Sequence, residues 1–290
     1  MASCSANSST APSLSRPAWW REAPAAIRVG VYVGQASYNS VIFSYRARNK
    51  SNRAPECSIG YQNFDQSQIA VDASANVYSP DFRTADINIY GPNCGSLIAS
   101  VNDPYGSDVD VAVGENGIFY GVGGTHVSVC TLSGCTSELT HPSIKQLETA
   151  AVDAGGTVWA SYYNQSGVPS LIAWTPRGDV QVMNGYVNQN TPGDLMFDNR
   201  GRLVSLQTRF LKVYVYQRDV YEATCFKPKT YRLKAGSLFG SLNAANTDFQ
   251  ATDYANDSVD VYTYPHFTYE YSYSRGLKAS HGVQEIAQVP

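Results

Sequence analysis

One short pattern recurs along this chain of 290 residues, and it constrains the fold more than any other feature. An apolar run ends in an Asp, a turn bearing Gly or Asn follows, and a strand rich in Val, Tyr or Trp comes next. The clearest copies are IAVDASANVY (69–78), AAVDAGGTVWASYY (150–163) and LMFDNRGRLVSLQT (195–208). Looser copies are VAVGENGIFYGV (111–122), with Gly114 in place of the Asp, and ATDYANDSVDVYTY (251–264). Strand units that recur every ~40–45 residues are typical of a β-propeller.

The strands after each turn recur in step. By subtraction they lie 41, 40, 45 and 56 residues apart, as marked by Val77, Ile118, Val158, Leu203 and Val259. A third apolar segment follows each of them, with the sequences INIYG, VSVCT, LIAWT, KVYVY and TYEYS. This regular spacing and alternating pattern predict a series of antiparallel sheets, one for each copy.

One further sheet is split between the two ends of the chain. Residues 29–36 and 41–46 predict its second and third strands and 57–62 the fourth, but no apolar run precedes them. The missing first strand is GVQEIAQVP (282–290). Because pairing both chain ends in one sheet leaves no long open edge, we expect the ring to close there.

The sequence therefore predicts an all-β, six-bladed β-propeller with four antiparallel strands in each blade. A flexible tether (1–27) precedes it, and blade one combines 28–66 with 282–290. The other blades are expected at 67–106, 107–146, 147–190, 191–246 and 247–281. The pattern IAVD-ASA-NVY resembles the NHL-repeat and related bacterial exported propellers over about 28–290. This resemblance implies an architecture and leaves the function open, since such propellers bind or catalyse many things.

The composition favours an exported protein that does not bind nucleic acid. The chain contains 21 Tyr and only 16% charged residues, which fits an all-β secreted protein. Its net charge of −3 argues against general nucleic-acid binding. Ala2-Ser3-Cys4 and the Ser/Asn/Pro-rich segment after it resemble the end of a bacterial lipoprotein signal, in which Cys4 would carry the lipid. The alternative is a plain tail with an incidental Cys.

The cysteines indicate an oxidising compartment. Cys130 and Cys135 flank the turn TLSG between two expected strands, so we predict that they form a disulfide. The sequence leaves the partners of Cys57, Cys94 and Cys225 open. Unrelated thiols are the alternative, because a free Cys is often a small core residue.

Two sets of polar residues recur at fixed places in the repeat. Asp72, Asp153, Asp198 and Asp253 end strands and precede turns, where an Asp side chain accepts backbone N–H bonds. A second set is expected where the inner strands begin, at one mouth of the central channel. Carboxylates that converge there would bind a cation or a polar ligand, and a merely polar wall is the alternative. The predicted ligand-binding residues are Gln68, Asp110, Glu148, Thr149, Asp194, Asp248 and Glu285.

Two basic runs lie on connections between third and fourth strands, at the outer rim. They are 46–53 and the stretch that contains Lys227, Lys229, Arg232 and Lys234. We interpret them first as solvated hairpins and second as a patch for a partner or an anionic surface.

No catalytic residue can be assigned, because the chain has no HExxH, G-x-S-x-G or P-loop motif and its four His are scattered. We expect a monomeric, exported, non-enzymatic propeller without a cofactor, attached to a membrane only if Cys4 carries a lipid. It would bind a protein or a small molecule on one face or at the channel mouth. The alternative is a metal-dependent hydrolase or lyase of the gluconolactonase or streptogramin-lyase type. Its divalent ion would be held by Asp110, Glu148, Asp194 and Glu285. A structural surface domain without a ligand is a third interpretation.

Overall fold

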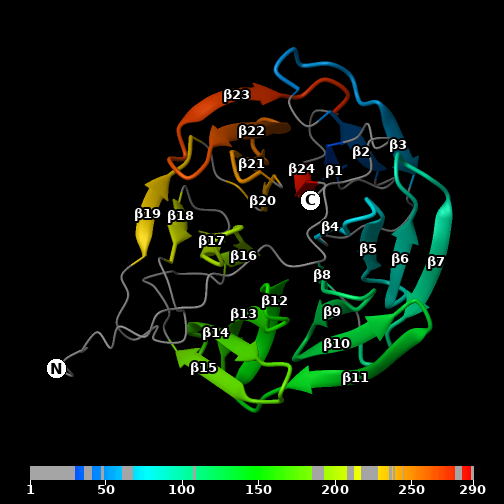
Figure 1. The fold of residues 1–290 in the computed structure, drawn as a ribbon, viewed down its shortest axis with the longest axis vertical. Helices are drawn as coiled ribbons and strands as arrows, with labels where there is room; N and C mark the ends of the chain where they lie inside the picture. The colour runs from blue at the N-terminus through cyan, green and yellow to red at the C-terminus, as the bar shows by residue number, and fades with distance from the viewer. Residues whose placement is uncertain are drawn as a thin grey trace.

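The computed structural model describes residues 30–35, 41–46, 49–60, 68–106, 109–184, 193–207, 212–216, 228–234, 237, 239–243, 245–277 and 283–288. In these ranges the strands form six antiparallel sheets of four strands, which stand as blades around one axis (Figure 1). The same ranges contain no helix that could cross a membrane. The predicted six-bladed β-propeller is confirmed.

The blades are described here from the inner to the outer strand. Blade one contains β24 (Val283–Gln288), β1 (Val31–Gln35), β2 (Val41–Tyr45) and β3 (Cys57–Gly60). Blade two contains β4 (Ala70–Val71), β5 (Val77–Asp81), β6 (Asp86–Tyr90) and β7 (Leu97–Asn102). Blade three contains β8 (Asp110–Val113), β9 (Phe119–Gly123), β10 (His126–Thr131) and β11 (Gly134–Thr140).

The second half of the ring follows the same order. Blade four contains β12 (Ile144–Val152), β13 (Val158–Asn164), β14 (Pro169–Trp174) and β15 (Val180–Asn184). Blade five contains β16 (Gly193–Phe197), β17 (Leu203–Gln207), β18 (Lys212–Val215) and β19 (Lys229–Arg232). Blade six contains β20 (Gly240–Leu242), β21 (Asp248–Asp253), β22 (Ser258–Thr263) and β23 (Tyr269–Tyr273).

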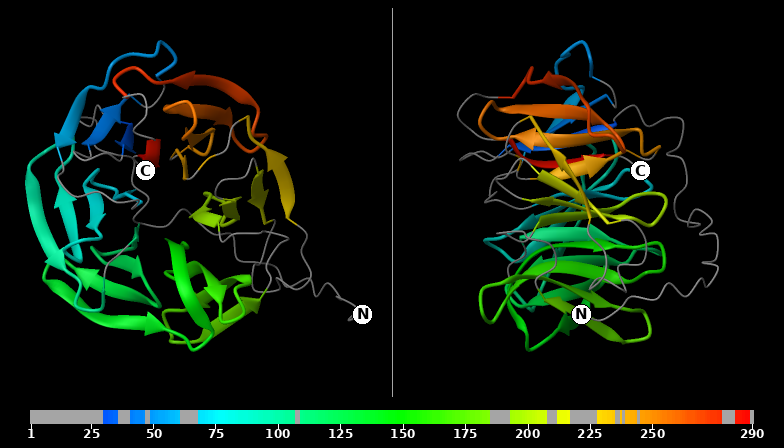
Figure 2. Two further views of the ribbon diagram at one scale, coloured as in Figure 1. Left: turned by 180° about the vertical axis from the view of Figure 1, so that it is seen from behind. Right: turned by 90° about the vertical axis from the view of Figure 1, so that its left-hand side faces the viewer.

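The ring closes within blade one, as the sequence predicts. The C-terminal strand β24 pairs antiparallel with β1, so that Ile286 lies opposite Val33 and Gln288 opposite Val31. Figure 2 shows this red strand beside the blue N-terminal strands at the centre of the ring. Ile286 is buried in a cluster with Val33 and with Val261 of blade six. The last strand of the chain therefore joins the first blade to the sixth.

The apolar core lies between adjacent blades. Second and third strands such as β5 and β14 are buried along their whole length, because both faces of each sheet contact a neighbouring blade. Trp159 and Leu171 of blade four, for example, pack in one cluster with Leu195 of blade five. Each buried side chain of this kind contributes ~1.5–3 kcal/mol. The outermost strands β7 and β11 are mostly exposed; β11 has a polar sequence, whereas β7 exposes Leu97 and Ile98.

The recurring Asp residues shape the turns, as expected. Oδ1 of Asp72 accepts the N–H groups of Ser74 and Asn76 at 2.8 and 2.9 Å. Asp153 and Asp198 accept the N–H groups two and four residues ahead in the same way. Each carboxylate thus fixes the turn that follows its inner strand.

Blade six corrects one strand assignment of the sequence analysis. Residues 251–253 were expected in an inner strand and TYEYS (268–272) in a third strand. Instead β20 is the inner strand, β21 is the second, and TYEYS contributes to the outermost strand β23. The sequence pattern missed β20 because its turn begins with Asn243 rather than Asp. Asn243 Oδ1 accepts the N–H groups of Thr247 and Asp248, so the amide replaces the usual carboxylate.

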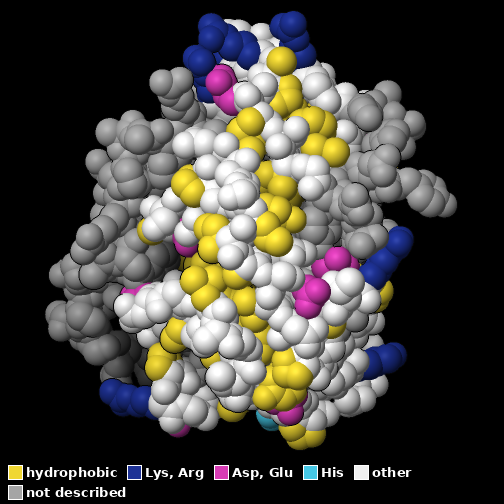
Figure 3. All heavy atoms as spheres, turned by 90° about the vertical axis from the view of Figure 1, so that its right-hand side faces the viewer, with side chains coloured by type: hydrophobic (Ala, Val, Ile, Leu, Met, Phe, Trp, Pro, Cys, Tyr) yellow, Lys and Arg dark blue, Asp and Glu magenta, His cyan; other side chains and the backbone are white. Residues whose placement is uncertain are grey.

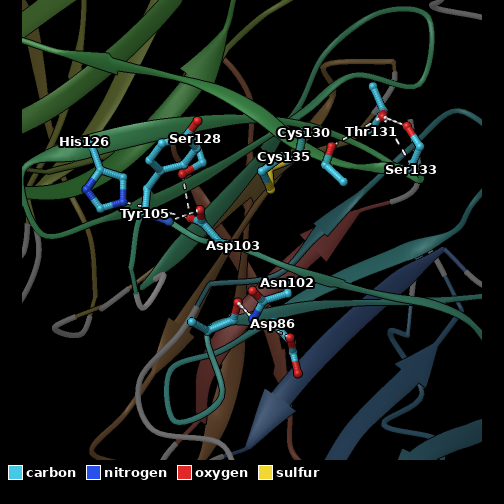
Figure 4. The surroundings of a disulfide bond; sticks show 12 residues. Asp86, Asn102, Asp103, Tyr105, His126, Ser128, Cys130, Thr131, Ser133 and Cys135 are labelled. Carbon is cyan, nitrogen blue, oxygen red and sulfur yellow. Dashed lines mark hydrogen bonds and ion pairs between the residues drawn. A yellow bond between two sulfur atoms is a disulfide. The ribbon is translucent and has the colours of Figure 1, made fainter.

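Two disulfides hold the outer part of the ring. The predicted Cys130–Cys135 bridge is confirmed and joins β10 to β11 (Figure 4). A second bridge links Cys57 of β3 to Cys94, which lies in the turn between β6 and β7, and so joins blade one to blade two. Cys4 and Cys225 lie outside the described residues.

The bridge between blades should stabilise the fold more than the bridge within a hairpin. In the chain-entropy description, a bridge across 37 residues contributes about 4 kcal/mol and one across 5 residues about 2 kcal/mol. We therefore expect the double variant Cys57→Ala/Cys94→Ala to lose more thermal stability than the matched variant Cys130→Ala/Cys135→Ala. Melting followed by circular dichroism without reductant measures both. An equal or larger loss in the hairpin variant would contradict this expectation.

Candidate functional site

Four of the predicted site residues come together near the axis. Gln68 precedes β4, Asp110 begins β8, Thr149 lies in β12 and Asp194 lies in β16, so the four come from different blades. The Gln68 side chain lies close enough to Asp194 to lower its pKa, and the charge of Asp194 acts on Asp110. We call these four residues the axial cluster. A ligand-binding role for it remains a prediction.

Asp110 connects blade three to blade four. Its side chain is buried, and Oδ1 accepts the N–H group of the next residue, Val111, at 2.6 Å. Oδ2 accepts the N–H group of Ala150 in the inner strand of blade four at 2.7 Å. Both carboxyl oxygens therefore accept hydrogen bonds from backbone N–H groups. These bonds stabilise the ionised form of a carboxyl group that is shielded from water.

Asp194 makes the equivalent connection between blades five and six. Its side chain is fully buried, and Oδ2 accepts the N–H group of Gly240 in β20 at 2.8 Å. Oδ1 has no hydrogen-bond partner of standard geometry among the described residues, and the same holds for Oε1 of Gln68. The Asp194 carboxyl thus has one structural oxygen and one that remains open to a proton or a ligand.

Thr149 and Gln68 also join neighbouring blades. The Thr149 hydroxyl donates to the carbonyl oxygen of Gly193 at 3.4 Å, which links blade four to blade five. The Gln68 N–H group donates to the carbonyl oxygen of Val109 at 3.0 Å, which links blade two to blade three. Every member of the axial cluster therefore takes part in a contact between inner strands.

Burial dominates the electrostatics of the two carboxyl groups. It raises the pKa of Asp194 to about 7, although hydrogen bonds from Gly240, the Gln68 side chain and Leu195 lower it. Burial also raises the pKa of Asp110 well above its usual range. The hydrogen bond from Ala150 lowers that pKa, and the nearby charge of Asp194 raises it. The pair therefore retains protons more readily than exposed carboxyl groups do.

The other three predicted residues have different surroundings or lie outside what the structure describes. Glu148 is half-buried and accepts a hydrogen bond from Gln146 at 2.9 Å. The position predicted for Asp248 is wrong, because this residue begins the second strand β21 beside the β20–β21 turn and accepts a bond from Asn243. It lies at the opposite end of its blade from the start of the inner strand. Glu285 lies in β24 opposite Gly34, and its side chain is outside the description.

Among the described residues, the axial cluster contains two carboxyl groups, those of Asp110 and Asp194. Ca²⁺ is usually held by six to eight oxygen atoms, so about three carboxylates or their equivalents must converge. The part of the chain that the structure describes contains no group of three or more His, Cys, Asp or Glu side chains that could hold a metal ion.

A Ser–Asp–His group that the sequence analysis did not identify lies between blades two and three (Figure 4). Oδ2 of Asp103 accepts the Ser128 hydroxyl at 2.5 Å, and Nε2 of His126 lies 3.9 Å from the same oxygen. In a hydrolytic triad the serine donates to the histidine, whereas here it donates to the aspartate. The group therefore fixes the connection between the two blades to β10 and has no activated nucleophile. The sequence gives no signal for this group, because Asp103 follows the last strand of blade two and His126 and Ser128 lie in blade three.

Comparison with known proteins supports the fold class alone. The chain matches no protein-family model and no curated protein sequence. A solved nidogen/laminin complex is similar at a TM-score of 0.69 and 11% identity, over 90% of this chain and 99% of that one. A streptogramin B lyase has a TM-score of 0.56 and 11% identity, over 74% of this chain and 70% of that one.

A third similar structure is regucalcin, a calcium-binding protein from Agrobacterium tumefaciens. Its TM-score is 0.56 at 10% identity, over 76% of this chain and 77% of that one. The similar structures thus include a binding protein and an enzyme. Identities this low establish the propeller fold and do not transfer an activity.

Asp194→Asn should make the stability of the protein less dependent on pH. A carboxyl group with a higher pKa in the folded chain than in the unfolded chain destabilises the fold as pH rises between the two values. For Asp194 this window ends at about 7, and the effect is at most about 4 kcal/mol. Asn cannot ionise and keeps an oxygen for the Gly240 N–H group. The melting temperature of the variant relative to wild type should therefore be higher near pH 8 than near pH 5.

Asp179→Asn is the matched control, because it removes the same charge at an exposed position. Its melting temperature relative to wild type should stay constant over this range. A constant difference for Asp194→Asn as well would show that Asp194 does not titrate in this window.

Proposed function

We propose that the protein is an exported β-propeller that binds a partner on its surface and is not an enzyme. The observation that carries this proposal is that the axial carboxyl groups connect neighbouring blades. Asp110 and Asp194 accept backbone N–H groups from the inner strands of blades four and six. Carboxyl groups held in this way connect blades, and this function accounts for their burial without a substrate.

Export is part of the proposal and rests on the disulfides. The Cys57–Cys94 and Cys130–Cys135 bridges are typical of proteins in oxidising compartments. A lipid on Cys4 and a tether over 1–27 would attach the propeller to a membrane surface while leaving its faces accessible. We infer a monomer, since each blade already has a neighbour on both sides.

A metal-dependent hydrolase or lyase is the second candidate, and one observation favours it. Oδ1 of Asp194 has no partner of standard geometry among the described residues, and burial raises the pKa of this group to about 7. A carboxyl group with a pKa near the working pH suits general acid–base catalysis. The candidate also requires a divalent ion near Asp110, Asp194, Glu148 and Glu285.

Metal analysis separates the two candidates. For a binding propeller we expect purified protein to contain no stoichiometric Ca²⁺, Mg²⁺ or Zn²⁺, and EDTA to leave its melting temperature unchanged. An ion present at 100 times its dissociation constant would add about 2.7 kcal/mol of stability. A stoichiometric ion, together with a fall in melting temperature in EDTA, would overturn the proposal. Loss of that ion in Asp194→Asn but not in Asp179→Asn would place it at the axis.

A further inference from the structure

Two basic segments that lie far apart in the sequence flank the same blade. The β2–β3 connection of blade one carries Arg46, Lys50 and Arg53. Figure 3 shows Lys and Arg side chains gathered at the top of the molecule in that view. Blade five carries Lys229 and Arg232 in β19, and Lys234 follows that strand. Blade six stands between these two blades (Figure 1). The fold thus assembles one surface that the sequence shows only as separate runs.

The β2–β3 connection is attached directly to the outer edge of blade six. Asn52 Oδ1 accepts the N–H groups of Ser274 and Arg275, both at 2.8 Å. The Lys50 Nζ atom lies 3.7 Å from Glu270 and 5.6 Å from the centre of the Tyr271 ring. These contacts add the exposed Arg275 to the same surface.

The segment from blade five contacts the other part of the same outer strand. Lys234 Nζ lies 3.1 Å from the Tyr269 hydroxyl and 4.2 Å from the centre of that ring. Lys229 Nζ lies 5.0 Å from the centre of the Tyr231 ring. A lysine therefore covers each of three tyrosines along this edge, in the pairs Lys50–Tyr271, Lys234–Tyr269 and Lys229–Tyr231. We call the surface the basic rim; its cations are Arg46, Lys50, Arg53, Lys229, Lys234 and Arg275. Arg232 is not included, because side chains alternate along β19 and Lys229 and Tyr231 occupy the face toward blade six.

Few acids neutralise the basic rim, although the charges of Asp260 and Asp253 act on Lys234. Glu56 pairs with Arg46 and Glu270 with Lys50, and both pairs are partly solvated, so a polyanion can compete for the cations. Arg53 and Arg275 form no ion pair with a described residue. The positive potential of the rim therefore extends into the solvent, where it attracts anions before they touch the protein.

The rest of the ring has the opposite charge. Residues 67–190, which were expected to form blades two to four, contain eleven Asp and Glu but only three Lys and Arg: Arg83, Lys145 and Arg177. The net charge of −3 therefore conceals a separation of charge between the two sides of the ring. Such a separation orients a charged partner toward the rim.

We propose that the basic rim binds an anionic polysaccharide. Ammonium and guanidinium groups that follow a curved edge match a flexible chain whose carboxylate, sulfate or phosphate groups are regularly spaced. The tyrosines beside them hold the lysine side chains in place, as the Tyr269 hydroxyl does by accepting from Lys234 Nζ at 3.1 Å. This inference rests on the proposed function, because it names the partner class of a binding propeller.

The aromatic geometry favours a sugar polymer over single-stranded nucleic acid. Bases bind by stacking on free aromatic faces. Tyr231 already contacts Lys229 and, at 4.6 Å between ring centres, Phe267. Tyr269 contacts Lys234 and, at 5.9 Å, Tyr262. A flat anionic bilayer also fits poorly, because the rim follows the convex circumference of the ring (Figure 1).

The test compares polymers that differ in charge, with the full chain in buffer containing EDTA. Wild type should bind dextran sulfate and polygalacturonate but not dextran, and added salt should weaken binding. The variant Lys50→Gln/Lys229→Gln/Lys234→Gln should bind about tenfold or more weakly, since it removes three cations from the rim. The matched variant Arg83→Gln/Lys145→Gln/Arg177→Gln removes three cations from blades two to four and should bind within about twofold of wild type.

Three results would overturn the inference. The first is that both triple variants bind the anionic polymers equally weakly. The second is that the wild-type protein binds neither anionic polymer. The third is that, at the same salt, it binds a single-stranded DNA oligonucleotide or phosphatidylglycerol vesicles more tightly than the anionic polymers. Each would leave the metal analysis unaffected. Conversely, a stoichiometric metal ion would overturn the proposed function without changing polysaccharide binding in EDTA.

Discussion

The pairing of β24 with β1 is the constraint on which the rest of the ring depends. A blade without its inner strand would expose the edge of β1 and part of the apolar interface with blade six. Because every blade packs against two neighbours, a gap at one place would weaken the interfaces on both sides. The Cys57–Cys94 bridge adds a second constraint at the outer edge of the same blade, where it meets blade two. Blade one, which is assembled from both ends of the chain, is thus held at its inner and its outer edge.

Polar contacts connect the inner strands near the axis, in addition to the apolar contacts between blades. Asp110 and Asp194 do this in the same way, two blades apart, by accepting an N–H group from the next inner strand. Burying a carboxyl group is costly unless donors compensate it, and burial raises the pKa of both groups although backbone N–H groups lower it. The carboxyl groups at the axis therefore connect blades, and they lose their protons less readily than exposed carboxyl groups do. The surface, and above all the basic rim, is where the proposed binding occurs.

The repeat made most of the fold predictable from the sequence, because strand periodicity and turn Asp residues are local signals. The inner strand of blade six was missed because Asn243 replaces the Asp that marks the other turns. Because that strand was missed, Asp248 was assigned to the inner strand instead of the second strand. Contacts between blades carry no local signal at all. The Cys57–Cys94 bridge, the approach of Gln68 to Asp194 and the convergence of the two basic runs on blade six all depend on the closed ring.

The central claim is that the axial carboxyl groups hold neighbouring blades together. Hydrogen exchange of the Ala150 and Gly240 amides, followed by NMR, tests it most directly, because these two groups donate to Asp110 and Asp194. The account predicts that both amides exchange as slowly as those at the centre of the sheets, and that Asp110→Ala selectively accelerates Ala150 and Asp194→Ala selectively accelerates Gly240. Rapid exchange of both amides in the wild-type protein would contradict it.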